Sequence, residues 1–167
     1  MISGRSCVHY CRMGRTFRMG IGVFLCAAGL LLTSCASLQR SADSGVVGRV
    51  AALINAGDAK ALASLSATPF LVDAEPVVLP ADVAAFWADA LKAGFRVDGA
   101  ALDTGVPVAA DSPGLFAGTA EVKWFFTRYV PKDARILDLT TTGGAHLRLI
   151  VRSGLFSTKL YGFKGPF

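Results

Sequence analysis

The sequence predicts an α+β domain in which helices precede a run of β-strands. Two observations support this class. Between residues 44 and 94, apolar residues recur at spacings of three and four, which is typical of helices with one buried face. From about residue 96 onward the pattern changes to short segments of alternating polarity, separated by turn residues. Because helices and strands are segregated along the chain, we expect an α+β fold rather than an alternating α/β fold.

Two consecutive helices are expected at the start of the domain. The first should begin near Asp43 or Ser44, since both residue types are good N-caps. Gly57 suits the position just after a helix end, and Asp58 is expected to cap a second, shorter helix. Pro69 should end that second helix, because proline disfavours a helical residue before it. The buried face of the first helix is expected to hold Val46, Val47, Val50, Leu53 and Ile54.

A third helix is the clearest prediction in the chain. Residues 70–79 have an extended pattern that is interrupted at Glu75 and Pro76, and Pro80 then suits the first helical turn. Gly94 is expected to stop the helix. The apolar stripe along this helix consists of Val83, Phe86, Trp87, Ala90 and Leu91.

The second half of the domain is predicted to be rich in strands. Gly143 and Gly144 indicate a hairpin turn between two of them. A long strand rich in aromatic residues is expected at 119–130, and Pro131 begins the turn that follows it. The predicted strands cover residues 96–109, 119–130, 136–142, 145–152 and 156–163.

Alternation of side chains assigns the faces of these strands. On residues 119–130, the more apolar set is expected to face the helices, and it consists of Ala120, Val122, Trp124, Phe126, Arg128 and Val130. The outward set of the same strand would include Phe125 and Tyr129. On residues 145–152, Leu147, Leu149 and Val151 should face inward, and His146, Arg148 and Ile150 outward.

Residues 50–65 and residues 82–94 carry a resemblance to a known superfamily. The first stretch is similar to the paired N-terminal helices of NTF2-like domains, which include the SnoaL-like and ketosteroid-isomerase-like groups, with a break at Gly57 and Asp58. The second stretch, with Phe86 and Trp87 and its terminal Gly94, is similar to the third helix of that superfamily. The resemblance implies a cone of three N-terminal helices packed on a curved antiparallel sheet, with ligands bound in its mouth. A cystatin-like or another helix-on-sheet fold is the alternative.

The first 34 residues have the organisation of a secretion signal. Arg12, Arg15 and Arg18 form a basic region, and residues 21–32 form an apolar segment that is too short to span a bilayer. The segment ends in Leu32-Thr33-Ser34-Cys35, which resembles the lipobox of bacterial lipoprotein precursors. The resemblance implies that fatty acyl chains are attached at Cys35 after cleavage behind Ser34. We therefore expect a leader at 1–34, a lipidated tether at 35–43 and a domain at 44–167.

Cysteine usage supports lipidation at Cys35. The other three cysteines, Cys7, Cys11 and Cys26, all lie in the leader, so Cys35 would have no disulfide partner after cleavage. The alternative is an ordinary secretory signal with a chance cysteine. Met13 and Met19 are alternative starts, because either gives a more typical leader.

The residues after the cysteine bear on location. Ala36 and Ser37 follow Cys35 without an aspartate, which resembles the pattern of lipoproteins sent to the outer rather than the inner membrane. The expected location is therefore the cell envelope, outside the cytoplasm. Four of the 17 basic residues lie in the leader, which leaves 13 basic and 12 acidic residues and a net charge of +1 from residue 35 onward. A nearly neutral domain gives no electrostatic basis for binding nucleic acid.

Few residues of the domain suggest chemistry. His146 is the one histidine outside the leader, and we expect it on the exposed face of its strand, where a solvated side chain is the simplest interpretation. With one histidine and no cysteine cluster, neither a metal site nor a cofactor is expected. A ligand at the mouth of the cone would be lined by Trp87, Trp124, Phe126 and Arg128. Aromatic residues at such spacing also commonly fill a core, and Arg128 could instead pair with Asp103 or Glu121.

Three hypotheses about function follow. The first is a non-catalytic lipoprotein that binds a small apolar or anionic ligand, or a protein partner, at the membrane. The second is an isomerase-like or hydrolase-like enzyme with Asp103 or Asp73 as general base, and either carboxylate buried beside Tyr129 or Tyr161 would support it. The third is an assembly protein that forms homodimers through an exposed apolar sheet face. The residues that motivate this third hypothesis are Phe125, Tyr129, Ile150, Tyr161 and Phe163.

Overall fold

The computed structural model describes residues 17–154 and 157–167, with side chains from residue 36 onward. The chain divides into two compact units, residues 1–39 and residues 40–167. The side chains of Cys35 and of the leader lie outside the described part, and so does Phe156, which we placed in the last strand. None of the described helices has the length and apolar character needed to cross a membrane.

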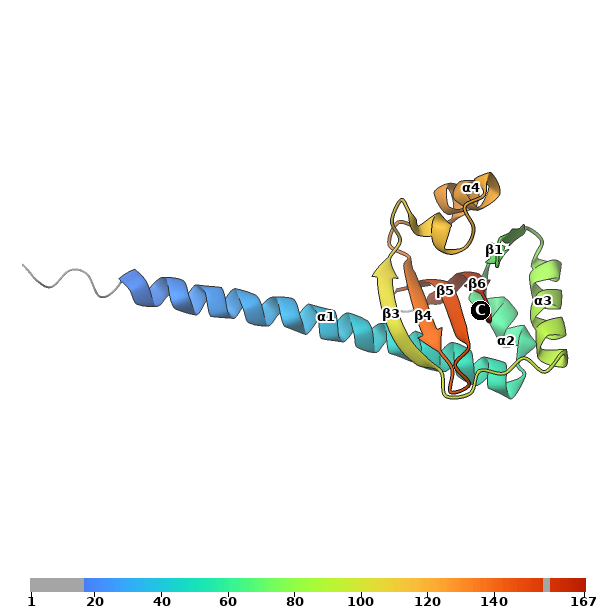
Figure 1. Ribbon diagram of the computed structural model, residues 1–167, viewed down its shortest axis with the longest axis horizontal. Helices are drawn as coiled ribbons and strands as arrows, with labels where there is room; N and C mark the ends of the chain where they lie inside the picture. The colour runs from blue at the N-terminus through green and yellow to red at the C-terminus, as the bar shows by residue number, and fades with distance from the viewer. Residues whose placement is uncertain (1–16, 155–156) are drawn as a thin grey trace, which may run out of the picture. The chain divides into compact units, whose positions relative to one another are not determined.

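Three helices precede most of the sheet, as the sequence predicted. They are α1 (Phe17–Ala56), α2 (Ala59–Leu65) and α3 (Pro80–Lys92) (Figure 1). Gly57 has a φ of 73° between α1 and α2, a value that glycine adopts without strain. The Asp58 carboxylate caps α2 by accepting a hydrogen bond from the Ala61 amide at 2.9 Å. The predicted apolar faces are buried at Val46, Val47, Val50, Ile54, Leu62, Leu65, Val83, Trp87 and Leu91.

The start of the first helix differs from our prediction. Asp43 and Ser44 do not begin a helix but lie inside α1, which also includes the residues expected as a tether. Asp43 is 2% exposed, and its carboxylate pairs with the Arg135 guanidinium at 2.9–3.1 Å. Arg135 also donates to the Gly105 carbonyl at 2.6 Å. A residue of N-cap type therefore serves here as a buried ion-pair partner, which local sequence pattern does not reveal.

The sheet has six strands in the order β2-β1-β6-β5-β4-β3. It is mixed, because β1 pairs in parallel with β6 while the other neighbours are antiparallel, so our prediction of an antiparallel sheet is only partly met. The second helix ends at Leu65, before Pro69, because the chain turns at Ser66 directly into the first strand. The strands are β1 (Ser66–Val72), β2 (Glu75–Val77), β3 (Ala101–Pro107), β4 (Arg135–Thr140), β5 (His146–Ser153) and β6 (Thr158–Lys164).

The predicted strand at residues 119–130 is wrong, because this segment forms the helix α4 (Ala120–Tyr129). The Thr119 hydroxyl caps α4 by accepting from the Val122 amide at 3.3 Å. Glu121 in the first turn and Arg128 in the last turn suit the helix dipole. The buried residues Val122, Phe125 and Phe126 have helical spacing, and this spacing outweighs the strand propensity of aromatic and β-branched side chains.

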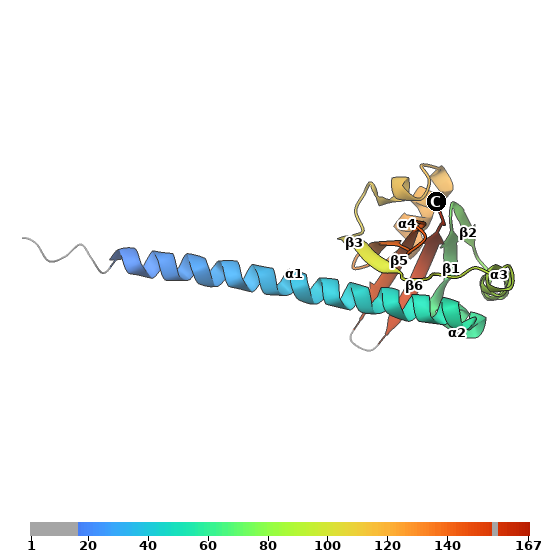
Figure 2. The same cartoon turned by 60° about the horizontal axis from the view of Figure 1, so that its bottom comes forward.

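Helix α4 and the short 3-10 helix η1 (Ser112–Leu115) belong to one insertion between β3 and β4, residues 108–134. Figure 2 shows α4 on one side of the sheet, with α2 on the other. The α+β class is confirmed, but the domain has a fourth helix in addition to the three that were expected. Consequently both faces of the sheet are covered.

Two apolar cores result from this arrangement. The first lies between the sheet and α1, α2 and α3, and it contains the inward residues predicted for β5, namely Leu147, Leu149 and Val151. The second lies between the sheet and the insertion, and it contains Leu71, Phe116, Val122, Phe125, Phe126, Val130, Ala134, Ile136 and Ile150. All residues of both cores lie between positions 46 and 163. The unit of residues 40–167 therefore carries its own cores and is expected to fold without the leader.

The last strand departs from simple alternation. The pairing of β5 with β6 shifts register at Ile150 and Val151. As a result, Leu160 and Phe163 both face the first core, although we predicted Phe163 on the outward face. A register irregularity of this kind reassigns the side chains beyond it to the opposite face.

We predict that truncation of Phe125 destabilises the domain, whereas truncation of its neighbour Trp124 has little effect. Phe125→Ala should lower the free energy of unfolding by about 3–4 kcal/mol, because it empties a buried site in the second core. Trp124→Ala should change it by less than about 0.5 kcal/mol, because the side chain is exposed. Urea unfolding of residues 36–167 measures both. A larger loss for Trp124 would indicate the strand rather than the helix.

Candidate functional site

The C-terminal residues 164–167 separate two hollows on the surface of the domain. Phe167 pairs with His146 through two backbone hydrogen bonds of 3.1 and 3.2 Å, which adds a short extended segment beside β5. The Asp73 carboxylate accepts from the Gly165 amide at 3.0 Å and holds the same segment from the other side. Gly165 has a φ of 116°, and a Cβ there would lie 2.7 Å from the His146 carbonyl oxygen. The position therefore requires glycine.

The first hollow, which we call the apolar pocket, lies between the end of α3 and the C-terminal segment. Its cavity volume is about 330 Å³. Phe95 and Phe163 meet edge to face at 5.6 Å, and Phe86 packs against Phe163 at 6.0 Å. No ionisable side chain occurs among its lining residues, which are Phe86, Ala90, Ala93, Gly94, Phe95, Phe163, Gly165 and Pro166.

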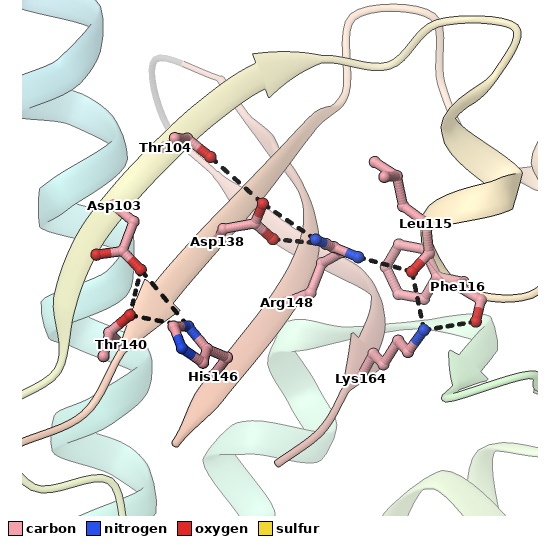
Figure 3. Close-up of polar contacts among 9 residues, drawn as sticks. All are labelled: Asp103, Thr104, Leu115, Phe116, Asp138, Thr140, His146, Arg148 and Lys164. Carbon is pink, nitrogen blue, oxygen red and sulfur yellow. Dashed lines mark hydrogen bonds and ion pairs between the residues drawn. The ribbon is translucent and has the colours of Figure 1, made fainter. Parts of the chain in front are cut away.

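The second hollow contains a group of hydrogen-bonded side chains on the outward face of β3, β4 and β5 (Figure 3). We call this group the polar cluster, and it consists of Asp103, Thr104, Asp138, Thr140, His146 and Arg148. Thr140 donates its hydroxyl hydrogen to Asp103 in a short hydrogen bond. The same hydroxyl oxygen lies 3.0 Å from Nδ1 of His146, and Nδ1 is 4.0 Å from the Asp103 carboxylate. Because the single hydroxyl hydrogen of Thr140 is donated to Asp103, the contact with His146 requires a hydrogen on Nδ1.

Arg148 forms the other half of the polar cluster. Its guanidinium contacts the Asp138 carboxylate at 2.5 and 3.2 Å, and Asp138 also accepts from Thr104 at 3.3 Å (Figure 3). Arg148 and Lys164 both donate to the Leu115 carbonyl, at 2.6 and 2.9 Å. These cations therefore attach the insertion to the sheet rather than remaining available to a ligand.

The chemistry available in the polar cluster is limited. The hollow has a volume of about 190 Å³ and is lined by Asp103, Thr104, Asp138, His146, Leu147, Arg148 and Phe167. His146 is 55% exposed and Asp103 is 42% exposed, so both side chains are well solvated. Among the described residues, no three His, Cys, Asp or Glu side chains converge as a metal site would require. The cluster joins three strands at their outer face.

Arg152 and Asp133 form an ion pair that lines neither hollow. A hydrogen bond from Arg152 lowers the pKa of Asp133 below its ordinary value, and the two atoms are 2.8 Å apart. This pair is exposed at the end of the insertion, so solvent screens it. It contributes little to either hollow.

The four residues predicted to bind a ligand do not come together. Trp87 is fully buried in the first core and donates its indole hydrogen to the Ser66 hydroxyl at 2.9 Å. Trp124, Phe126 and Arg128 lie on α4, which belongs to the insertion that packs on the opposite face of the sheet. The prediction of one shared inner face depended on a strand at 119–130, and the helix removes it. Phe126 fills the second core, while Trp124 is 56% exposed.

The two proposed general bases, Asp73 and Asp103, form hydrogen bonds to residues other than Tyr129 and Tyr161. Asp73 anchors the Gly165 amide, and Asp103 accepts from Thr140. Tyr129 packs against Phe125 and Trp124 on α4. Tyr161 lies beside Arg152 at the outer surface. His146 occupies the exposed strand position that the sequence predicted.

The apolar surface considered for dimerisation is largely covered. Ile150 and Phe125 are buried in the second core, and Phe163 is buried in the first. Tyr129 and Tyr161 pack against the second core with partial exposure. The insertion thus covers Ile150 on this face of the sheet and itself contains Phe125 and Tyr129.

Sequence reasoning missed most of the apolar pocket. Phe86 and Ala90 were placed correctly on the stripe of the third helix, but Phe95 and Phe163 were not expected beside them. A signal was present, because residues 163–167 contain Gly165 and Pro166 after the last strand, a combination that turns the chain. The direction of that turn depends on Asp73, which is distant in sequence.

Comparison of the chain with models of known protein families gave no match, and a search of curated proteins gave none either.

We predict that Gly165→Ala destabilises the domain by about 1–3 kcal/mol, because alanine is strained at this φ and would overlap the His146 carbonyl. Gly118→Ala is the matched control, because a Cβ there meets open space, and it should change the free energy by less than about 0.5 kcal/mol. Urea unfolding gives both values. Hydrogen exchange at the His146 amide should accelerate only in Gly165→Ala, and unchanged exchange would show that the C-terminal segment is not held there.

Proposed function

We propose that this protein is a lipid-anchored, non-catalytic binding protein that holds a small apolar ligand in the apolar pocket. The observation that carries the proposal is a pocket of about 330 Å³ lined by aromatic and small residues without an ionisable side chain. General acid–base catalysis needs a titratable group within hydrogen-bond reach of the substrate, and this pocket offers none among its lining residues.

The size and lining of the apolar pocket favour a small ring compound. Its volume is at the lower end of the range of roughly 300–1,000 Å³ that ligand sites occupy. The rings of Phe95 and Phe163 are at 80° to one another, so a planar ligand could stack on one while meeting the edge of the other. An anionic ligand is less suited, because no cationic side chain lines the pocket.

The fold we propose is of the NTF2-like type. Its support is the order of elements, in which paired helices, the β1–β2 hairpin and a third helix precede the remaining strands. The six-stranded sheet packs its first core against these three helices. The insertion with α4 is an addition to the pattern that the resemblance implies, and it covers the second face.

The proposed location is the outer membrane of the cell envelope, with Cys35 carrying the lipid. Support comes from the leader, the lipobox-like Leu32 to Cys35 and the absence of an acidic residue at positions 36 and 37. Two or more acyl chains hold a protein at a bilayer durably, whereas one chain binds only marginally. An anchored binding protein would retain its ligand at the membrane surface.

Ligand binding can be tested by filling the apolar pocket. Ala90→Leu adds three carbon atoms to a lining residue and should weaken binding of N-phenyl-1-naphthylamine by at least about tenfold. Ala84→Leu is the matched control on the exposed side of the same helix and should leave affinity unchanged. Probe fluorescence is titrated with residues 36–167, which contain both cores, and circular dichroism checks that each variant folds. Equal affinity of both variants and the unaltered domain would exclude the apolar pocket.

The anchor is tested by Cys35→Ala in the full chain. This variant should move from the membrane to the soluble fraction on cell fractionation, because it lacks the thiol that carries the acyl chains. Ser37→Ala, two residues away, should stay with the membrane. Mass spectrometry of the membrane-bound protein should show acylated Cys35 at its N-terminus. An unmodified N-terminus would contradict the proposal.

A further inference from the structure

Helix α4 presents an unusual exposed face. Trp124 is 56% exposed and packs edge-on against Tyr129, with ring centroids 5.2 Å apart. Arg128 lies four residues after Trp124 and is therefore its neighbour on the helix surface. The opposite face of α4 is already filled by buried residues of the second core. Trp124 is thus not needed for the packing of the domain.

Tryptophan and tyrosine beside basic side chains are typical of surfaces that enter the interfacial region of a bilayer. The exposed positions of α4 include two cations, Lys123 and Arg128, and one acid, Glu121. Leu115, on η1 of the same insertion, is also among the exposed large apolar residues of the domain. The insertion therefore presents an exposed tryptophan, an exposed leucine and two cations to its surroundings.

The end of the insertion lies next to Arg135, a residue that contacts α1. The insertion leaves the sheet after Pro107 and returns at Arg135, and Arg135 pairs with Asp43 of α1. Asp43 is eight residues after Cys35. That length spans about 12 Å as a helix and at most about 27 Å when extended. A lipid on Cys35 would therefore keep this end of the domain close to the bilayer.

We propose that the exposed face of α4, with Trp124, Tyr129 and Arg128, docks on the phospholipid headgroup region of the membrane to which the chain is anchored. This inference rests on the proposed lipid anchor. A weak contact is sufficient, because the anchor makes docking intramolecular and raises the effective concentration of the surface. Docking would set the orientation of the domain on the bilayer.

The two tryptophans of the chain provide the measurement. Trp87 is fully buried and Trp124 is exposed, so only Trp124 can reach a quencher in the lipid. The full lipidated protein, purified from membranes, is reconstituted into vesicles of phosphatidylcholine and phosphatidylglycerol with brominated acyl chains. We expect a loss of tryptophan emission relative to unbrominated vesicles, and no such loss in Trp124→Phe.

Charge and aromatic controls sharpen this test. Arg128→Glu should reduce the quenching, whereas Lys60→Glu, the same change on an exposed position of α2, should leave it unaltered. Phe167→Ser removes an equally exposed aromatic residue at the polar cluster and should also leave it unaltered.

Two outcomes would overturn the inference that α4 docks on the membrane. If the protein floats with the vesicles but its emission is not quenched, the anchor stands and α4 does not face lipid, as would be the case for a protein partner on this face. If the protein does not float with the vesicles, the proposed anchor fails, and the docking inference fails with it.

Discussion

The structure depends on the apolar character of both faces of the central strands. In β5, the consecutive residues Leu149, Ile150 and Val151 are all buried, and Ile136 and Leu137 are buried in succession on β4. Since side chains alternate between faces, such runs place apolar surface on both sides of the sheet. Water would contact one side unless a second layer covered it. The insertion with α4 supplies that layer, and its aromatic residues complete the second core.

The C-terminal segment borders both of the hollows described above, with Gly165 and Pro166 in the apolar pocket and Phe167 at the polar cluster. Asp73 and the backbone of His146 hold the segment in place. Two residues that are natural candidates for catalysis thus position the segment that borders the apolar pocket. Their chemistry is used for hydrogen bonds within the chain.

One buried ion pair connects α1 to β4, the strand that follows the insertion. Asp43 on α1 and Arg135 on β4 meet beside Gly105, where a Cβ would overlap the Asp43 carboxylate. Breaking a buried pair by removing one partner leaves an uncompensated charge and is generally costly. The pair therefore holds α1 against β4, the strand that follows the insertion.

Sequence alone determined the elements whose signals are local. The helix capped by Asp58, the helix that begins at Pro80, the turns at Gly57 and Gly94, and the inward face of β5 could be predicted, because each depends on neighbouring residues. Tertiary structure decided the rest. Residues 119–130 have strand propensity but form a helix, because only helical spacing brings Val122, Phe125 and Phe126 together over the second face. The apolar pocket likewise joins Phe95 to Phe163, and their contact depends on a register shift and a distant carboxylate that no local pattern contains.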